Sequence, residues 1–218
     1  RIDRKHGDAM TRFGDLTGRH YDLVDYYGDP QAERVLVIMG SGSQTVRHTV
    51  DHLNATGARV GMIQLRMHRP FPAEQILAAI PASAKVVAVL DRTKEPGAGG
   101  EPLFLDVAAA LGEAHAAGRR ERLPLLIGGR YGLSSKEFTP AMVVGIFDEL
   151  ALASPRPRFT IGINDDVTMT SLPWDRSIDI EDPAFEALLV GRKVKVLLRD
   201  VDLIRWKQDL IEDRNRLA

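Results

Sequence analysis

Short β-branched apolar runs alternate with helical spacings between residues 34 and 163. Five of these runs predict strands, at residues 35–39, 60–65, 86–90, 123–127 and 159–163. Segments with apolar residues three and four apart predict helices near 44–55, 73–79, 103–117 and 140–152. This alternation is typical of parallel strands joined by crossover helices. It predicts an α/β domain with five strands in one open sheet.

The pattern divides the chain into three parts. Residues 1–33 are polar and predict a lead-in segment, which its aromatic residues and leucines attach to the domain surface. Residues 34–173 form the α/β domain. Residues 174–218 form a tail, with one further strand expected at 194–198 and a charged amphipathic helix at 201–217.

Composition narrows the classes of function. Lys and Arg total 29 against 30 Asp and Glu, so no overall field attracts nucleic acid or anionic lipid. No apolar run approaches the roughly 20 residues that cross a bilayer, and no hydrophobic signal segment follows Arg1–His6. We therefore expect a cytoplasmic location. The sequence has no cysteine, so this chain offers no thiolate for a disulfide, a zinc ion or an iron–sulfur cluster.

Four loops follow predicted strands, where open α/β sheets usually bind ligands or partners. In the first loop, Gly40, Ser41 and Gly42 open a helix whose amino terminus could hold a phosphate. However, Thr45 stands where the dinucleotide fingerprint needs a third glycine, and no acidic residue ends the second strand. A tight structural turn is favoured over NAD binding.

The second loop carries charged and polar residues before a glycine run, and these can make charge-assisted hydrogen bonds. Its candidate interface or ligand residues are Asp91, Arg92, Thr93, Lys94 and Glu95. The alternative is a solvated loop that caps the next helix.

The third loop lacks Gly-Lys-Ser/Thr at the spacing of a phosphate loop, which argues against a nucleotide triphosphatase. Its candidate residues are Arg130, Tyr131, Ser134, Ser135, Lys136 and Glu137. Arg130 and Lys136 could hold an anion or pair with carboxylates of neighbouring loops.

The fourth loop holds Asn164, Asp165 and Asp166. Adjacent carboxylates can bind Mg²⁺, but loop Asp and Asn more often cap turns, and we favour the structural role. His48 and His52 share a helical spacing without the glutamate of a zinc motif. We therefore assign no metal site and no catalytic residue to this chain.

Taken together, several motifs resemble the pyruvate:ferredoxin (flavodoxin) oxidoreductases in order and spacing, over about residues 13–173. Residues 90–97, 128–140 and 162–168 carry most of this resemblance. Shorter matches are 16–19, 26–30, 39–42 and 69–71.

The resemblance implies a large cytoplasmic enzyme that converts pyruvate and coenzyme A to acetyl-CoA and CO₂. Such an enzyme uses thiamine diphosphate with Mg²⁺ and passes electrons through [4Fe–4S] clusters to ferredoxin or flavodoxin. This region would be its transketolase C-terminal-like domain, a three-layer α/β/α unit with a mostly parallel five-stranded sheet. The chain would then contact other domains or subunits, with no cofactor of its own.

The departures from the family matter equally. No Gly-Asp-Gly motif is present to bind diphosphate through magnesium, and the tail beyond about residue 175 does not resemble the family. The chain would thus be a scaffold and interdomain interface that is not catalytic alone. Two alternatives remain: a standalone module that binds a phosphorylated ligand through Lys94, Arg130 and Lys136, and a partner-binding module in which 201–217 forms a homodimer.

The interface hypothesis carries a structural expectation. The charges of the loops should form one network at the carboxyl edge of the sheet, made of Asp91, Arg92, Lys94, Glu95, Arg130, Lys136, Glu137 and Asp165. Since exposed ion pairs add little stability, Arg130→Ala should hardly change the melting temperature of the chain itself.

Overall fold

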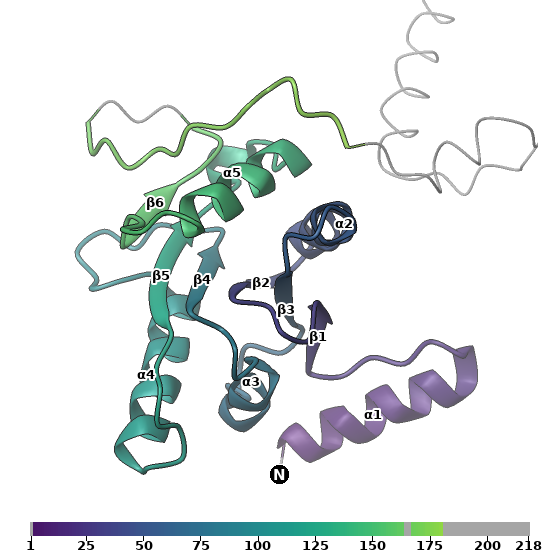
Figure 1. The fold of residues 1–218 in the computed structure, drawn as a ribbon. Coiled ribbons are helices and arrows are strands. Elements are labelled where there is room, and N and C mark those ends of the chain that lie inside the picture. Colours follow the sequence, from purple (N-terminus) through teal and green to yellow (C-terminus); the bar gives the residue numbers. More distant parts are fainter. Residues whose placement is uncertain (1, 164–166, 181–218) are drawn as a thin grey trace, which may run out of the picture. The chain divides into compact units, whose positions relative to one another are not determined.

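The computed structural model describes residues 2–163 and 167–180, and side chains from Lys5 onward. The helices are α1 (Ile2–Thr17), α2 (Gly42–Ala55), α3 (Ala73–Ala79), α4 (Pro102–Ala116) and α5 (Pro140–Leu150), with a short 3₁₀ turn at Leu133–Ser135. The strands are β1 (Val24–Gly28), β2 (Arg34–Met39), β3 (Val60–Leu65), β4 (Val86–Asp91), β5 (Leu125–Arg130) and β6 (Arg158–Thr160). Figure 1 shows these elements along the chain.

The strands form one sheet in the order β1-β3-β2-β4-β5-β6. Strands β2 to β6 are parallel, and β1 pairs antiparallel with β3 at one edge. The α/β class and the mostly parallel sheet are confirmed, but the expected count of five strands was one too low. The additional strand β1 lies within the segment expected to be a lead-in. Its sequence, with Asp25 between Val24 and two tyrosines, lacks the aliphatic run of a central strand because an edge strand is only partly buried.

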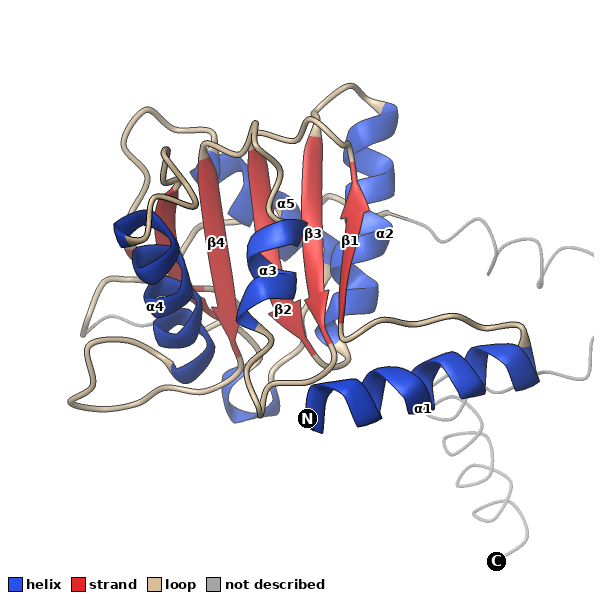
Figure 2. Ribbon diagram, turned by 90° about the horizontal axis from the view of Figure 1, so that it is seen from below, coloured by secondary structure: helices blue, strands red, loops and turns tan. Residues whose placement is uncertain are grey.

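Helices cover both faces of the sheet, which confirms the three-layer α/β/α arrangement. Figure 2 shows α3 and α4 in front of the strands and α2 and α5 behind them. On one face Val46 and Val50 of α2 and Phe147 of α5 are buried against strand residues. On the other, Ile76 of α3 and Val107 of α4 are buried in a second cluster. The central strands β2, β3 and β4 therefore bury alternate side chains into two cores.

Strand β5 extends further than its sequence suggested. The predicted strand ends at residue 127, but Gly128 and Gly129 continue it. A Cβ atom on Gly129 would lie 2.4 Å from the ring of Phe159 and 2.6 Å from Leu90. The glycines thus give neighbouring side chains room to pack. The longer strand also brings Arg130 into the sheet instead of a loop.

Helix α5 begins as the sequence predicted. The hydroxyl of Thr139 accepts a hydrogen bond from the Met142 amide, 3.4 Å away, and Pro140 takes the first helical position. The strand and helix expected at 194–198 and 201–217 lie outside the described residues. Within the described part of the chain, no helix is long and apolar enough to cross a membrane.

Candidate functional site

The order of the strands reverses at β2, which places the crevice position of an open α/β sheet at the carboxyl end of this strand. The chain passes from β2 to β3 on one side of β2, and then crosses to β4 on its other side. Open α/β sheets bind ligands where the strand order reverses in this way. The carboxyl end of β2 leads directly into Gly40, Ser41 and Gly42, which begin α2.

Tyr131 fills that crevice. Its hydroxyl donates a hydrogen bond to the carbonyl of Met39, 3.1 Å away, and the residue is 2% exposed. A Cβ on Gly42 would lie 2.8 Å from the tyrosine ring, so glycine at this position makes room for Tyr131. Burial raises the pKa of Tyr131. The amino terminus of α2 therefore faces a protein side chain, which supports the structural turn over a phosphate site.

Asp91 ends β4 and is 1% exposed, so it is not the loop residue that the sequence suggested. Its two carboxylate oxygens accept hydrogen bonds from the backbone N–H groups of Leu103 and Phe104, at 3.0 and 3.1 Å. Burial raises the pKa of Asp91, although these two hydrogen bonds act in the opposite direction. Asp91 thus accepts hydrogen bonds from two backbone N–H groups in the first turn of α4, which have no partner within the helix.

Arg130 ends β5 and pairs in register with Asp91 of β4 and Thr160 of β6. Its Nε lies 3.1 Å from Oε1 of Glu101, and the two side chains are 10% and 6% exposed. The angle does not qualify as a hydrogen bond, so the pairing is an electrostatic contact. Arg130 is therefore not the exposed loop charge that the sequence suggested. The expectation that Arg130→Ala hardly changes the melting temperature stays a prediction, although this burial argues against it.

The structure brings only part of the expected network together. Arg92 donates from Nε to the carbonyl of Gly132, 3.4 Å away, and Thr93 is half-buried. The remaining charged candidates are exposed and make no ion pair with any described residue; these are Lys94, Glu95, Lys136 and Glu137. Ser134 and Ser135 are exposed in left-handed backbone, with φ of 54° and 57°. Asn164, Asp165 and Asp166 lie outside the described residues.

Comparisons with known proteins bear on what this domain is. The family model for "Pyruvate:ferredoxin oxidoreductase core domain II" matches residues 32–130, from just before β2 to the end of β5. A pyruvate-flavodoxin oxidoreductase of Trichormus variabilis is 55% identical over 184 residues, 84% of this chain. A second, from a Nostoc species, is 56% identical over 172 residues, 79% of this chain. The chain belongs to the pyruvate:ferredoxin (flavodoxin) oxidoreductase family.

The chain is one domain of the larger oxidoreductases of this family. It spans 15% of the length of the Trichormus relative and 41% of that of the Nostoc relative. A solved 2-oxoglutarate:ferredoxin oxidoreductase from Magnetococcus marinus aligns with a TM-score of 0.39 and 19% identity. That alignment covers 68% of this chain and 23% of the solved one, and it is too distant to carry an argument.

This oxidoreductase domain contains site residues that the sequence did not single out. Glu101 lies in the second loop, and its position before Pro102 marks the start of a helix. Asp106 on α4 binds Nε2 of His68, 2.8 Å away, and also Nη1 of Arg69. No local motif signals Asp106, because its partners are more than thirty residues earlier. The described residues contain no cluster of three metal-ligating side chains.

Proposed function

We propose that this chain serves as a scaffold and an interface between domains in an enzyme that oxidises pyruvate. The complete enzyme would convert pyruvate and coenzyme A to acetyl-CoA and CO₂ in the cytoplasm, and pass electrons to flavodoxin or ferredoxin. The names of the relatives support the substrate and the acceptor, because both described above are pyruvate-flavodoxin oxidoreductases. The reaction and the partners are those of the whole protein, of which this chain supplies one domain.

The cofactors of such an enzyme do not fit the described part of this chain. Thiamine diphosphate with Mg²⁺ needs a diphosphate cradle, but Tyr131 fills the crevice at the amino terminus of α2. The [4Fe–4S] clusters need cysteine ligands, and the sequence has none. We therefore assign thiamine diphosphate and the clusters to other domains, and derive no chemical step from the residues of this one.

One observation carries the proposal. Lys94, Glu95, Lys136 and Glu137 gather in two loops at the carboxyl edge, and none of them pairs with a described residue. Exposed charges contribute little to the stability of their own domain, but charges desolvated at a contact between domains need partners. Loops that hold opposite charges without internal pairs are therefore suited to complementary contacts.

The test exchanges charge at this edge in the complete enzyme. We expect Lys94→Glu with Lys136→Glu to impair assembly or turnover, because two cations become anions at the contact. Arg122→Glu is the matched control, since Arg122 is exposed before β5 at the opposite edge of the sheet. The measurements are size-exclusion chromatography and pyruvate-dependent reduction of a viologen dye. Wild-type assembly and turnover in the double variant would refute the proposal.

The chain alone gives a second test. Without cluster ligands or a diphosphate cradle, it should reduce no viologen with pyruvate and coenzyme A, even when thiamine diphosphate and Mg²⁺ are added. Turnover above the rate without protein would show that this domain contains an active site.

A further inference from the structure

Arg130 has hydrogen-bonding capacity that the described chain leaves unused. The residue is 9% exposed, and its Nε is fully buried without a hydrogen bond. Its terminal nitrogens, Nη1 and Nη2, make no hydrogen bond to a described residue. Neither of these two atoms is fully buried, so the tip of the guanidinium reaches the surface at the carboxyl edge.

The neighbouring Arg158 does not share this shortage. Arg158, on the adjacent strand β6, donates from Nη2 to the carbonyl of Gly99, 2.9 Å away. Its guanidinium also stacks 3.8 Å above the ring of Phe104. Arg158 is thus satisfied within the domain, whereas the more deeply buried Arg130 has only an electrostatic contact with Glu101. Burying a guanidinium with free donors is costly unless a partner completes it.

The surroundings of Arg130 define the chemistry of that partner. The two terminal nitrogens of a guanidinium form a planar fork that matches a carboxylate. A phosphate dianion fits less well, because Asp91 and Glu101 add two buried acidic groups to the same cluster. A single carboxylate adds only one negative charge.

We propose that the terminal nitrogens of Arg130 bind a carboxylate presented by an adjoining domain of the larger enzyme. Arg130 then bridges this carboxylate and Glu101. The source of the carboxylate rests on the proposed function, but the binding site itself belongs to this chain.

The first test uses the 218-residue chain with formate as the probe. Formate should raise the melting temperature above that in chloride at equal ionic strength, because a ligand of the folded state stabilises it. Glu101→Gln should tighten formate binding several-fold, since it removes the competing negative charge. The double variant Arg130→Met with Glu101→Gln should lose the formate response without leaving a buried charge. Arg158→Met is the control and should keep it.

Several results would overturn the site. They are a formate response equal to that of chloride, a response that survives in the double variant, and inorganic phosphate binding as tightly as formate. Arg130→Lys keeps the charge beside Glu101 and should show a weakened response, because an ammonium has no planar fork.

The second test concerns the source of the carboxylate. In the complete enzyme, Arg130→Lys should make assembly fail at a lower salt concentration than in the wild type. If formate binds the chain but assembly of this variant is unchanged at every salt concentration, an adjoining domain is not the occupant and the proposal is wrong. Failure of the proposed interface function would be seen in a different variant. It would appear as unchanged assembly of the Lys94→Glu, Lys136→Glu enzyme.

Discussion

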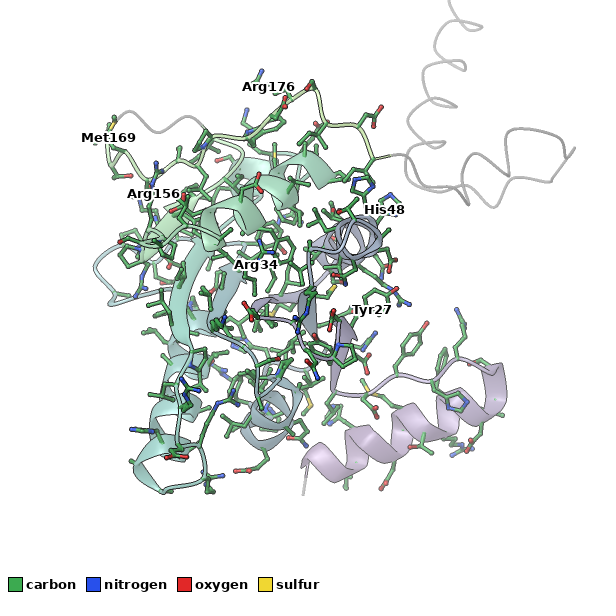
Figure 3. The ribbon with its side chains drawn as sticks, in the orientation of Figure 1. Tyr27, Arg34, His48, Arg156, Met169 and Arg176 are labelled. Carbon is green, nitrogen blue, oxygen red and sulfur yellow. The ribbon has the colours of Figure 1, made fainter. Side chains whose placement is uncertain are left out.

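Arginines at the two edges of the sheet have opposite surroundings. At the amino edge, Arg34 begins β2 and donates to the carbonyls of Phe147 and Ala58, at 3.2 and 2.8 Å (Figure 3). Arg120 lies near the same edge and donates to the carbonyls of Leu77, Ile80 and Pro81. Several of these carbonyls belong to the last turns of helices, where cations are favoured.

At the carboxyl edge, Arg130 is more buried than Arg34 but makes no hydrogen bond within the described chain. The amino-edge arginines fasten helices to the sheet and are satisfied by their own domain. Arg130 is held by one acidic residue and keeps its terminal donors at the surface. Burial alone therefore does not distinguish a structural arginine from one that binds a partner outside its domain. The number of hydrogen-bonded donors on the guanidinium makes that distinction.

The largest expected effect is at the buried pair. Arg130→Ala should destabilise the chain by about 3 kcal/mol, because Glu101 remains buried without its counter-charge. Replacing both partners, with Arg130→Met and Glu101→Gln, should restore most of this loss. Urea unfolding of the three proteins measures the free energies. Wild-type stability in Arg130→Ala would show that the contact between Arg130 and Glu101 does not stabilise the domain.

The amino edge should respond differently. Arg34→Ala should cost about 2 kcal/mol through its two hydrogen bonds, and no second substitution should rescue it, because its partners are backbone carbonyls. Arg34→Lys should also fail to restore stability, since one ammonium cannot reach carbonyls on two segments. Arg122→Ala, an exposed control, should remain within about 0.5 kcal/mol of the wild type. Full stability in Arg34→Ala would remove the contrast between the edges.

Removal of the Tyr131 hydroxyl should change the free energy of unfolding by a smaller amount. Tyr131→Phe keeps the ring against Gly42 but loses the hydrogen bond to Met39, which should cost about 1 kcal/mol. Tyr21→Phe is the control, because the hydroxyl of Tyr21 has no hydrogen-bond partner among the described residues. Equal unfolding free energies for both variants would show that the Tyr131 hydroxyl does not close the crevice.

The contrast between the edges also marks what the sequence could predict. The central strands were predictable because aliphatic runs are the local signature of burial on two faces. Strand β1 was missed because Asp25, Tyr26 and Tyr27 carry no such run, and an edge strand does not need one. The predicted strand ends short of Gly129 because the role of this glycine depends on Phe159, thirty residues later.

The site was predictable in its location but not in its pairing. Charged residues after strands pointed to the carboxyl edge, and Asp91 and Arg130 do lie there side by side in register. The first turn of α4 donates to Asp91, and Glu101 just before that helix contacts Arg130. The partner Glu101 is fixed by that tertiary packing, so no spacing along the chain reveals it.

The smallest expected effect is a pH dependence. Burial raises the pKa of Asp91 above its ordinary value of 3.8, so the folded state binds this proton more tightly than the unfolded state does. Between the ordinary and the raised pKa, stability must therefore fall as pH rises. Asp175 provides the opposite case, because hydrogen bonds from Ser177 lower its pKa, so its contribution to stability is lost as pH falls through that lowered value.

We expect Asp91→Asn to remove a pH dependence that the wild type shows. Asparagine does not titrate and keeps one acceptor for the first turn of α4. The hydrogen bond that it loses therefore changes the free energy of unfolding by the same amount at every pH. The unfolding free energy of Asp91→Asn relative to the wild type should rise with pH from about 3.8 and become level above the raised pKa. Asp175→Asn should change in the other direction. Urea unfolding from about pH 2 to about pH 7 measures both curves, because the change at Asp175 extends below its ordinary pKa. Parallel curves for the wild type and Asp91→Asn would mean that Asp91 stays ionised at little cost. Burial of the charged carboxylate at the carboxyl edge would then destabilise the folded domain very little.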